Sequence, residues 1–158
     1  MADLWVFAEA AFLILGSIIA AKIAFIILDK VVMKLTKRTK TDVDDKIVKA
    51  IEKPVYLAII IYGAFYSLGL VIPAEYASYK DLGLTVLLSF VGIWVAIKIS
   101  DIFIGSYMHA LAKKTESSFD DELVGLFQRF SKIFIFAVGI MLMLGGMGVE
   151  ITPLIASM

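Results

Sequence analysis

Two pairs of adjacent carboxylates have a spacing that could support metal binding or acid–base catalysis. They are Asp44-Asp45 and Asp120-Asp121. Paired carboxylates can bind a divalent cation or act as a general acid and a general base. Neither pair has a histidine nearby or sits within a recognised metal-ligand spacing. The first turn of a helix, where the helix dipole stabilises carboxylates, accounts for both pairs, so we expect helix capping and no metal site.

The remaining reactive residue types give little indication of catalysis. His109 is the single histidine, and it has no nucleophile or carboxylate partner in a recognisable motif, so we expect it at the membrane interface. The chain has no cysteine, which excludes disulfides and thiolate metal sites. No phosphate-binding loop or nucleophile elbow is present. The sequence therefore predicts that the protein is not an enzyme and needs no cofactor.

The segment around each aspartate pair occurs twice. Residues 37–48 and 113–124 share a basic pair, a threonine, a polar linker, an apolar residue, Asp-Asp and an apolar run, at an offset of 76 positions. The same offset relates four further pairs of identical residues: Gly16 and Gly92, Lys22 and Lys98, Gly63 and Gly139, and Gly69 and Gly145. Agreement of several residue types at one offset indicates an internal duplication.

The composition indicates a membrane protein. The chain has 158 residues, of which 61% are hydrophobic and 19% charged, and its mean hydropathy is +0.93. A soluble domain is closer to half apolar and a quarter charged. The start of the chain lacks the basic region of a signal peptide. Apolar blocks long enough to span a bilayer cover 4–28, 55–72, 82–97 continuing to about 111, and about 120–144.

These blocks predict an all-α membrane protein with four main transmembrane helices, arranged as two tandem parallel-repeat helical hairpins. We expect the first transmembrane hairpin over 1–72, with its turn at 36–46, and the second over 73–148, with its turn at 112–122. Basic residues gather at both turns, so the positive-inside rule predicts cytoplasmic turns and an N-terminus outside. A cell membrane, plasma or inner, is the expected location.

Three local features refine this expectation. The start of the second block is amphipathic and is expected at or near the membrane surface, with Pro54 permitting a bend or a fresh helix start. Residues 73–81 are expected to form a short polar turn with interfacial tyrosines. Lys98 and Asp101 stand three residues apart, close enough to pair on one helix face.

Two stretches of the sequence resemble a known family. The first block ends in Lys-Leu-Thr-Lys-Arg-Thr-Lys-Thr at 34–41, followed by Asp-Val-Asp-Asp-Lys-Ile-Val and another helix. This pattern resembles the N-terminal transmembrane sensor region of small-conductance mechanosensitive channels, the MscS family. Residues 145–156, with the Gly-Gly-Met-Gly turn and then Thr-Pro-Leu-Ile-Ala, look like that family's approach to its pore helix.

The resemblance implies a homo-heptameric channel that opens under membrane tension, with outer helices facing lipid. It also implies a pore helix and a soluble vestibule that this sequence does not contain. Residues 149–158 are therefore interpreted as the start of a truncated pore-helix-like segment. We expect an isolated membrane region of a longer channel; the alternative is a natural short relative.

Candidate site residues fall into two groups. The cations are candidates for contact with lipid headgroups and for tension sensing: Lys22, Lys37, Arg38, Lys40, Lys98, Lys113 and Lys114. Snorkelling or local pairing is the favoured interpretation of Lys22 and Lys98, and an ion path or buried charge relay is the alternative. The glycines are candidate hinges or, preferably, packing positions: Gly16, Gly63, Gly69, Gly92, Gly139, Gly145, Gly146 and Gly148.

The leading functional hypothesis is tension sensing in a mechanosensitive ion channel, coupled to a pore beyond the C-terminus. The alternative is a non-channel membrane scaffold or accessory subunit that binds partner helices or lipids. A small transporter is a weaker third, because the polar residues cluster at the helix ends and not at mid-membrane. The expected partners are membrane lipids and, in the full-length protein, further copies of the chain; no nucleic acid is expected.

Overall fold

The computed structural model describes residues 2–32, 42–112 and 119–156, and these are almost entirely helical. Four long helices follow one another along the chain: α1 (Ala2–Ile27), α3 (Asp42–Val71), α4 (Ala77–Ala112) and α5 (Phe119–Gly146). Short elements accompany them: the π-helical turn η1 (Leu28–Val32), the 3₁₀ turn η2 (Ala74–Tyr76) and the short helix α6 (Thr152–Ala156). The all-α prediction is confirmed.

Each of the four long helices, together with η1 after α1 and η2 before α4, provides a segment long and apolar enough to cross a membrane. Within the described residues these segments are Leu4–Lys30, Asp45–Val71, Ala74–Ser106 and Glu122–Gly146. Each is at least as long as the roughly 20 helical residues that a hydrocarbon core requires. The predicted number and order of transmembrane helices are therefore confirmed.

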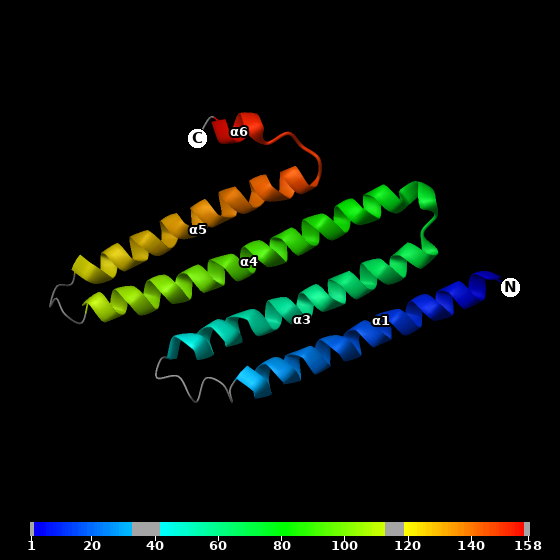
Figure 1. Cartoon of the computed structure of the whole chain (residues 1–158), viewed down its shortest axis with the longest axis horizontal. Coiled ribbons are helices and arrows are strands. Elements are labelled where there is room, and N and C mark those ends of the chain that lie inside the picture. Colours follow the sequence, from blue (N-terminus) through cyan, green and yellow to red (C-terminus); the bar gives the residue numbers. More distant parts are fainter. Residues whose placement is uncertain (1, 33–41, 113–118, 157–158) are drawn as a thin grey trace.

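The helices lie side by side in a single layer, each antiparallel to the next (Figure 1). Helix α1 packs against α3, α3 against α4, and α4 against α5, and these are the extensive contacts between long helices in the described part of the chain. The order of packing is the order along the sequence, as expected for helices joined by short connections. Two antiparallel pairs, α1 with α3 and α4 with α5, thus stand next to each other as tandem hairpins.

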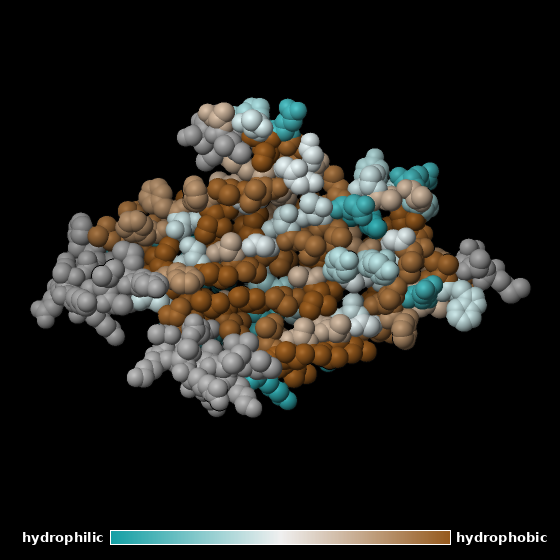
Figure 2. All heavy atoms as spheres, in the orientation of Figure 1, coloured by the Kyte–Doolittle hydropathy of each residue, from teal (hydrophilic) through white to brown (hydrophobic). Residues whose placement is uncertain are grey.

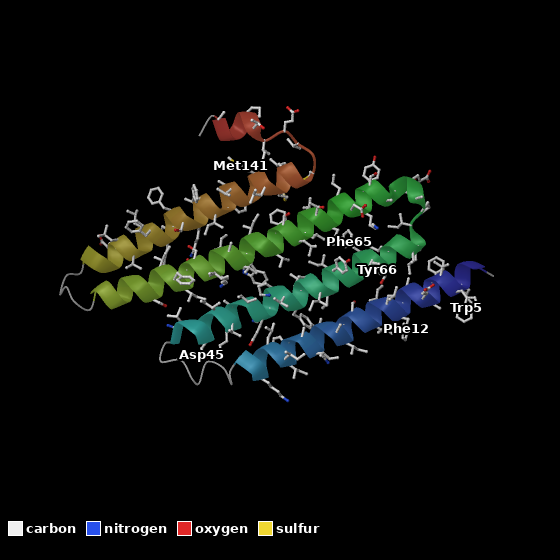
Figure 3. All side chains as sticks on the ribbon, in the orientation of Figure 1. Trp5, Phe12, Asp45, Phe65, Tyr66 and Met141 are labelled. Carbon is white, nitrogen blue, oxygen red and sulfur yellow. The ribbon has the colours of Figure 1, made fainter. Side chains whose placement is uncertain are left out.

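This layer has very little interior. Among the residues that the structure describes, the buried apolar side chains are Ala10, Ala21, Val91, Ile93 and Val124, together with Pro54. The accessible surface is 11480 Å², whereas a compact soluble protein of this mass exposes about 7,900 Å². Large side chains such as Trp5 and Phe12, labelled on α1 in Figure 3, are more than 70% exposed. Apolar side chains cover the middle of the face shown in Figure 2, and hydrophilic ones lie mainly toward the helix ends. Such a surface is stable in lipid and not in water.

Helix α3 runs without interruption through Pro54, so the fresh helix start that this proline would permit does not occur. A proline inside a helix removes one hydrogen bond and typically costs about 3 kcal/mol. The cost is offset by packing, because Pro54 is fully buried and the first turns of α3 contact η1. The rings of Phe25 on α1 and Tyr56 on α3 meet edge to face, with their centroids 6.3 Å apart. The amphipathic start of α3 therefore continues the transmembrane helix.

The connection between the hairpins is shorter than the predicted polar turn. Tyr76 N–H donates to the carbonyl of Pro73 at 2.9 Å, forming η2, and α4 already begins at Ala77. No helix-breaking residue follows Pro73 in this segment, so the helix resumes at once and includes Lys80 and Asp81. The prediction of a turn through Asp81 was wrong in extent by about one helical turn.

Candidate functional site: the helix–helix contacts of the two hairpins

Among the glycines, the closest contacts with a neighbouring helix fall at Gly63 and Gly139, which are related by the 76-residue offset. A side-chain carbon added at Gly63 on α3 would overlap Cβ of Ser17 on α1, and one added at Gly139 on α5 would overlap Cγ1 of Ile93 on α4. Ser17 and Ile93 are themselves related by that offset. The two hairpins therefore share one crossing register, and a glycine on the returning helix is what lets the backbones approach there.

The other predicted glycines have different surroundings. Gly16 and Gly92 have no neighbour within 4 Å of an added Cβ, so neither is a close-packing position. Three other glycines lie close to the end of a neighbouring side chain. An added Cβ at Gly69 would lie 3.0 Å from Nζ of Lys80. One at Gly145 would lie 3.2 Å from Cδ1 of Ile151, and one at Gly146 would lie 3.3 Å from Cγ2 of Thr85.

Gly148 has φ +85°, a left-handed conformation that L side chains adopt only with strain. It follows α5, and its N–H donates to the carbonyl of Gly145 at 3.0 Å. The glycine-rich stretch at 145–148 therefore ends the helix and turns the chain toward α6, which lies beside the end of α5 (Figure 1).

The same offset relates a second contact in each hairpin, but the chemistry differs. In the first hairpin Phe25 meets Tyr56 through an edge-to-face ring contact. In the second, the equivalent positions are Asp101 and Lys132, which form an ion pair at 3.0 Å between Nζ and Oδ2. The predicted pairing of Asp101 with Lys98 was wrong in its partner. Lys98 is exposed, and the interhelical register, which one helix alone does not reveal, brings Lys132 to Asp101.

The surroundings of this ion pair are partly buried and polar. The side chain of Asp101 is 27% exposed and that of Lys132 is 45% exposed. Oδ1 of Asp101 is buried and has no hydrogen-bond partner. One helical turn further toward the loop, the amide nitrogen of Gln128 lies 3.5 Å from where a Cβ of Gly105 would stand, an ordinary van der Waals distance.

At the opposite end of the layer, Lys80 contacts both hairpins. Lys80 on α4 extends over Gly69 near the C-terminal end of α3 and pairs with Asp81 at 3.2 Å. A cation near the C-terminus of a helix interacts favourably with its carbonyl end. The connection between the hairpins is thus stabilised by a side chain from the second hairpin that reaches the first.

The predicted headgroup cations are only partly within the described residues. Lys22 and Lys98 are exposed at equivalent places on α1 and α4, compatible with snorkelling. Lys37, Arg38, Lys40, Lys113 and Lys114 lie outside the described residues. The side chains of Asp44, Asp120, Asp121 and His109 also lie outside what the structure describes. In the described part of the chain, no three His, Cys, Asp or Glu side chains gather closely enough to bind a metal ion.

An open apolar groove of about 390 Å³ runs between α4 and α5. It is lined on one side by residues around Gly92 and on the other by residues that include Val138 and Leu142. Tyr62 and Tyr66 occupy the equivalent positions in the first hairpin, where both rings are exposed. At these two positions the second copy therefore carries smaller side chains than the first.

The chain is similar over most of its length to mechanosensitive channel proteins. It is 23% identical over 143 residues, 89% of the chain, to the large-conductance mechanosensitive channel MscMJLR of Methanocaldococcus jannaschii. It is 26% identical over 137 residues, 84% of the chain, to the small-conductance mechanosensitive channel MscMJ of the same organism. It is 32% identical over 151 residues, 94% of the chain, to an uncharacterised MscS family protein of Aquifex aeolicus.

The matched region makes up only part of these relatives. The chain spans 40% of the length of MscMJLR and 39% of each of the other two. No family model and no solved structure matches the chain. The three relatives confirm the resemblance indicated by the doubled turn and the glycine stretch: this integral membrane protein is related, over most of its length, to the mechanosensitive channels of the MscS family.

Proposed function

We propose that this chain is the tension-sensing membrane region of a mechanosensitive ion channel and couples forces in the bilayer to a pore beyond its C-terminus. The observation that carries the proposal is the single helical layer with almost no interior, in a chain similar to named mechanosensitive channels. Such a layer has its apolar faces covered by lipid or by neighbouring helices. Its conformational energy therefore depends directly on the state of the bilayer.

The physical mechanism is a shift of population between two conformations. Tension favours the conformation with the larger area in the membrane plane, and only that difference in area can drive a transition. Helices packed pairwise in one layer can tilt or slide against one another while little buried surface is lost, because each helix has at most two neighbours. The close contacts at Gly63 and Gly139 maintain each hairpin while the layer moves.

We further infer the orientation of the chain and its partners from the sequence. The turns at 36–46 and 112–122 face the cytoplasm, the N-terminus faces outside, and the membrane is the cell membrane, as their basic residues favour. The basic residues of the turns, with the exposed Lys22 and Lys98, contact anionic headgroups, each contributing on the order of 1 kcal/mol. The full-length protein assembles as a homo-oligomer, a heptamer by family resemblance.

The decisive experiment uses the full-length protein from which this region comes. It is reconstituted in liposomes, and excised patches are subjected to increasing suction, with protein-free liposomes as the control. We expect currents that appear at a reproducible tension below membrane rupture. Patches that contain the protein but remain silent up to rupture would contradict tension gating. The exposed apolar faces would then be assigned to binding partner helices, as a scaffold or accessory subunit does.

A further inference from the structure

The two hairpins are closed at one equivalent position by contacts of different kinds. Phe25 and Tyr56 meet through their rings, whereas Asp101 and Lys132 meet through opposite charges. Both members of the ion pair lie within segments apolar enough to span the membrane. Duplication thus supplied the same position in the two copies, and only the second copy places charges there.

These two contacts respond differently when one helix slides along the other. Ring contacts depend weakly on position, because a displaced ring finds other apolar atoms to touch. An ion pair depends more strongly on it, because the attraction falls as the two charges separate and a partly buried charge is then left without its partner. The register of α4 against α5 is therefore fixed far more sharply at this depth than the register of α1 against α3.

We propose that Asp101 and Lys132 form an electrostatic latch that fixes the register of the second hairpin, so that the second hairpin moves as a rigid unit and the first deforms more readily. The buried, unpartnered Oδ1 of Asp101 supports this assignment, because the carboxylate has no other described partner if Lys132 is withdrawn. The side chain of Gln128 on α5 also reaches Gly105 on α4, one turn away from the latch.

The latch is tested by distances between spin labels in this chain, reconstituted in lipid nanodiscs. The absence of cysteine allows labels at chosen positions only. One pair is placed at Leu87 and Leu142 across the second hairpin, and the other at the offset-related positions Ala11 and Tyr66 across the first; all four side chains are exposed. We expect a narrower distance distribution in the second hairpin than in the first.

Substitutions then separate the latch from ordinary packing. Lys132→Met should widen the distribution of the second hairpin to at least that of the first and leave the first unchanged. The exchange Asp101→Lys with Lys132→Asp should restore the narrow distribution. Arg129→Met, which removes an exposed cation from α5, the helix that carries Lys132, should change neither. If Lys132→Met prevents insertion, the uncharged pair Asp101→Asn with Lys132→Met is used in its place and should widen the same distribution.

An unchanged distribution in the variants that break the pair would overturn the latch, as would equal widening of both hairpins. The consequence for gating rests on the proposed function and is measured separately, as the threshold tension of the full-length channel. A threshold that shifts in Lys132→Met and returns with the charge exchange supports a role of the latch in gating. A widened distance distribution with an unchanged threshold tension would support the latch as a structural contact and refute its role in gating.

Discussion

The contact between Gly63 and Ser17 gives the sharpest prediction for stability. A methyl group at position 63 would overlap Cβ of Ser17, whose position is set by the backbone and not by a side-chain rotamer. Carbon atoms need about 3.5–4.0 Å, so α1 and α3 must part locally by roughly 1–2 Å. Overpacking of this kind typically costs about 1–3 kcal/mol, against a gain of at most about 1 kcal/mol for alanine over glycine in a helix.

We therefore expect Gly63→Ala to lower the free energy of unfolding by about 1–2 kcal/mol, the balance of these two effects. The assay is reversible unfolding in mixed micelles of mild detergent and dodecyl sulfate, followed by circular dichroism. Adding Ser17→Gly to Gly63→Ala moves the bulk from one helix to the other and should recover most of the loss. Gly16→Ala is the matched control, because no atom lies within 4 Å of its added carbon, and it should be neutral or stabilising.

Two results would refute this reasoning. If the free energy of unfolding of Gly63→Ala is within about 0.5 kcal/mol of that of the parent chain, the two backbones are not in close contact at this point. If Ser17→Gly does not rescue Gly63→Ala, the loss has another origin than the overlap of these two residues. The equivalent substitution Gly139→Ala should cost less, because its neighbour Ile93 presents Cγ1 and Cδ1, which can move by side-chain rotation.

Two further predictions concern the interior of α3 and the orientation of the chain. The hydroxyl of Ser67, which is fully buried, donates to the carbonyl of Gly63 at 2.8 Å. In the same unfolding assay, Ser67→Ala should lower the free energy of unfolding by about 1 kcal/mol or less, because one hydrogen bond is lost. Ser67→Leu should lower it by about 1–3 kcal/mol, because the larger side chain overpacks the site. Equal costs for the two would show that the site is not tightly packed. For orientation, single cysteines replace the exposed Tyr79 and Glu122 in whole cells treated with a membrane-impermeant maleimide. Tyr79→Cys should be labelled and Glu122→Cys protected, and the opposite pattern would reverse the proposed topology.

The helices themselves were predictable because lipid imposes a simple condition on sequence. A segment that spans a bilayer needs about 20 apolar residues, and such blocks are visible without knowledge of tertiary contacts. The offset of 76 residues was also visible, and it anticipated that Gly63 and Gly139 occupy equivalent places. It did not distinguish them from Gly16 and Gly92, which face open space.

What the sequence did not reveal depends on the register between helices. The partner of Asp101 was sought on its own helix, where spacing is known, whereas Lys132 reaches it from the next helix. Pro54 suggested a break because its local cost is known, whereas the packing of its buried ring is a tertiary effect. The offset pairs Lys132 with Tyr56 and Asp101 with Phe25, but it does not show that the members of either pair are in contact.

The single-layer arrangement also determines how effects of substitutions combine. Because α1 contacts α3, α3 contacts α4 and α4 contacts α5, the energetics resemble those of a one-dimensional array with nearest-neighbour couplings. A change at the Ser17–Gly63 contact reaches α5 only through two intervening interfaces. Double substitutions divided between the α1–α3 and α4–α5 interfaces should therefore be additive to within about 0.3–0.5 kcal/mol, unlike those in a protein with one shared core. Either hairpin can thus vary in sequence while the other retains its geometry.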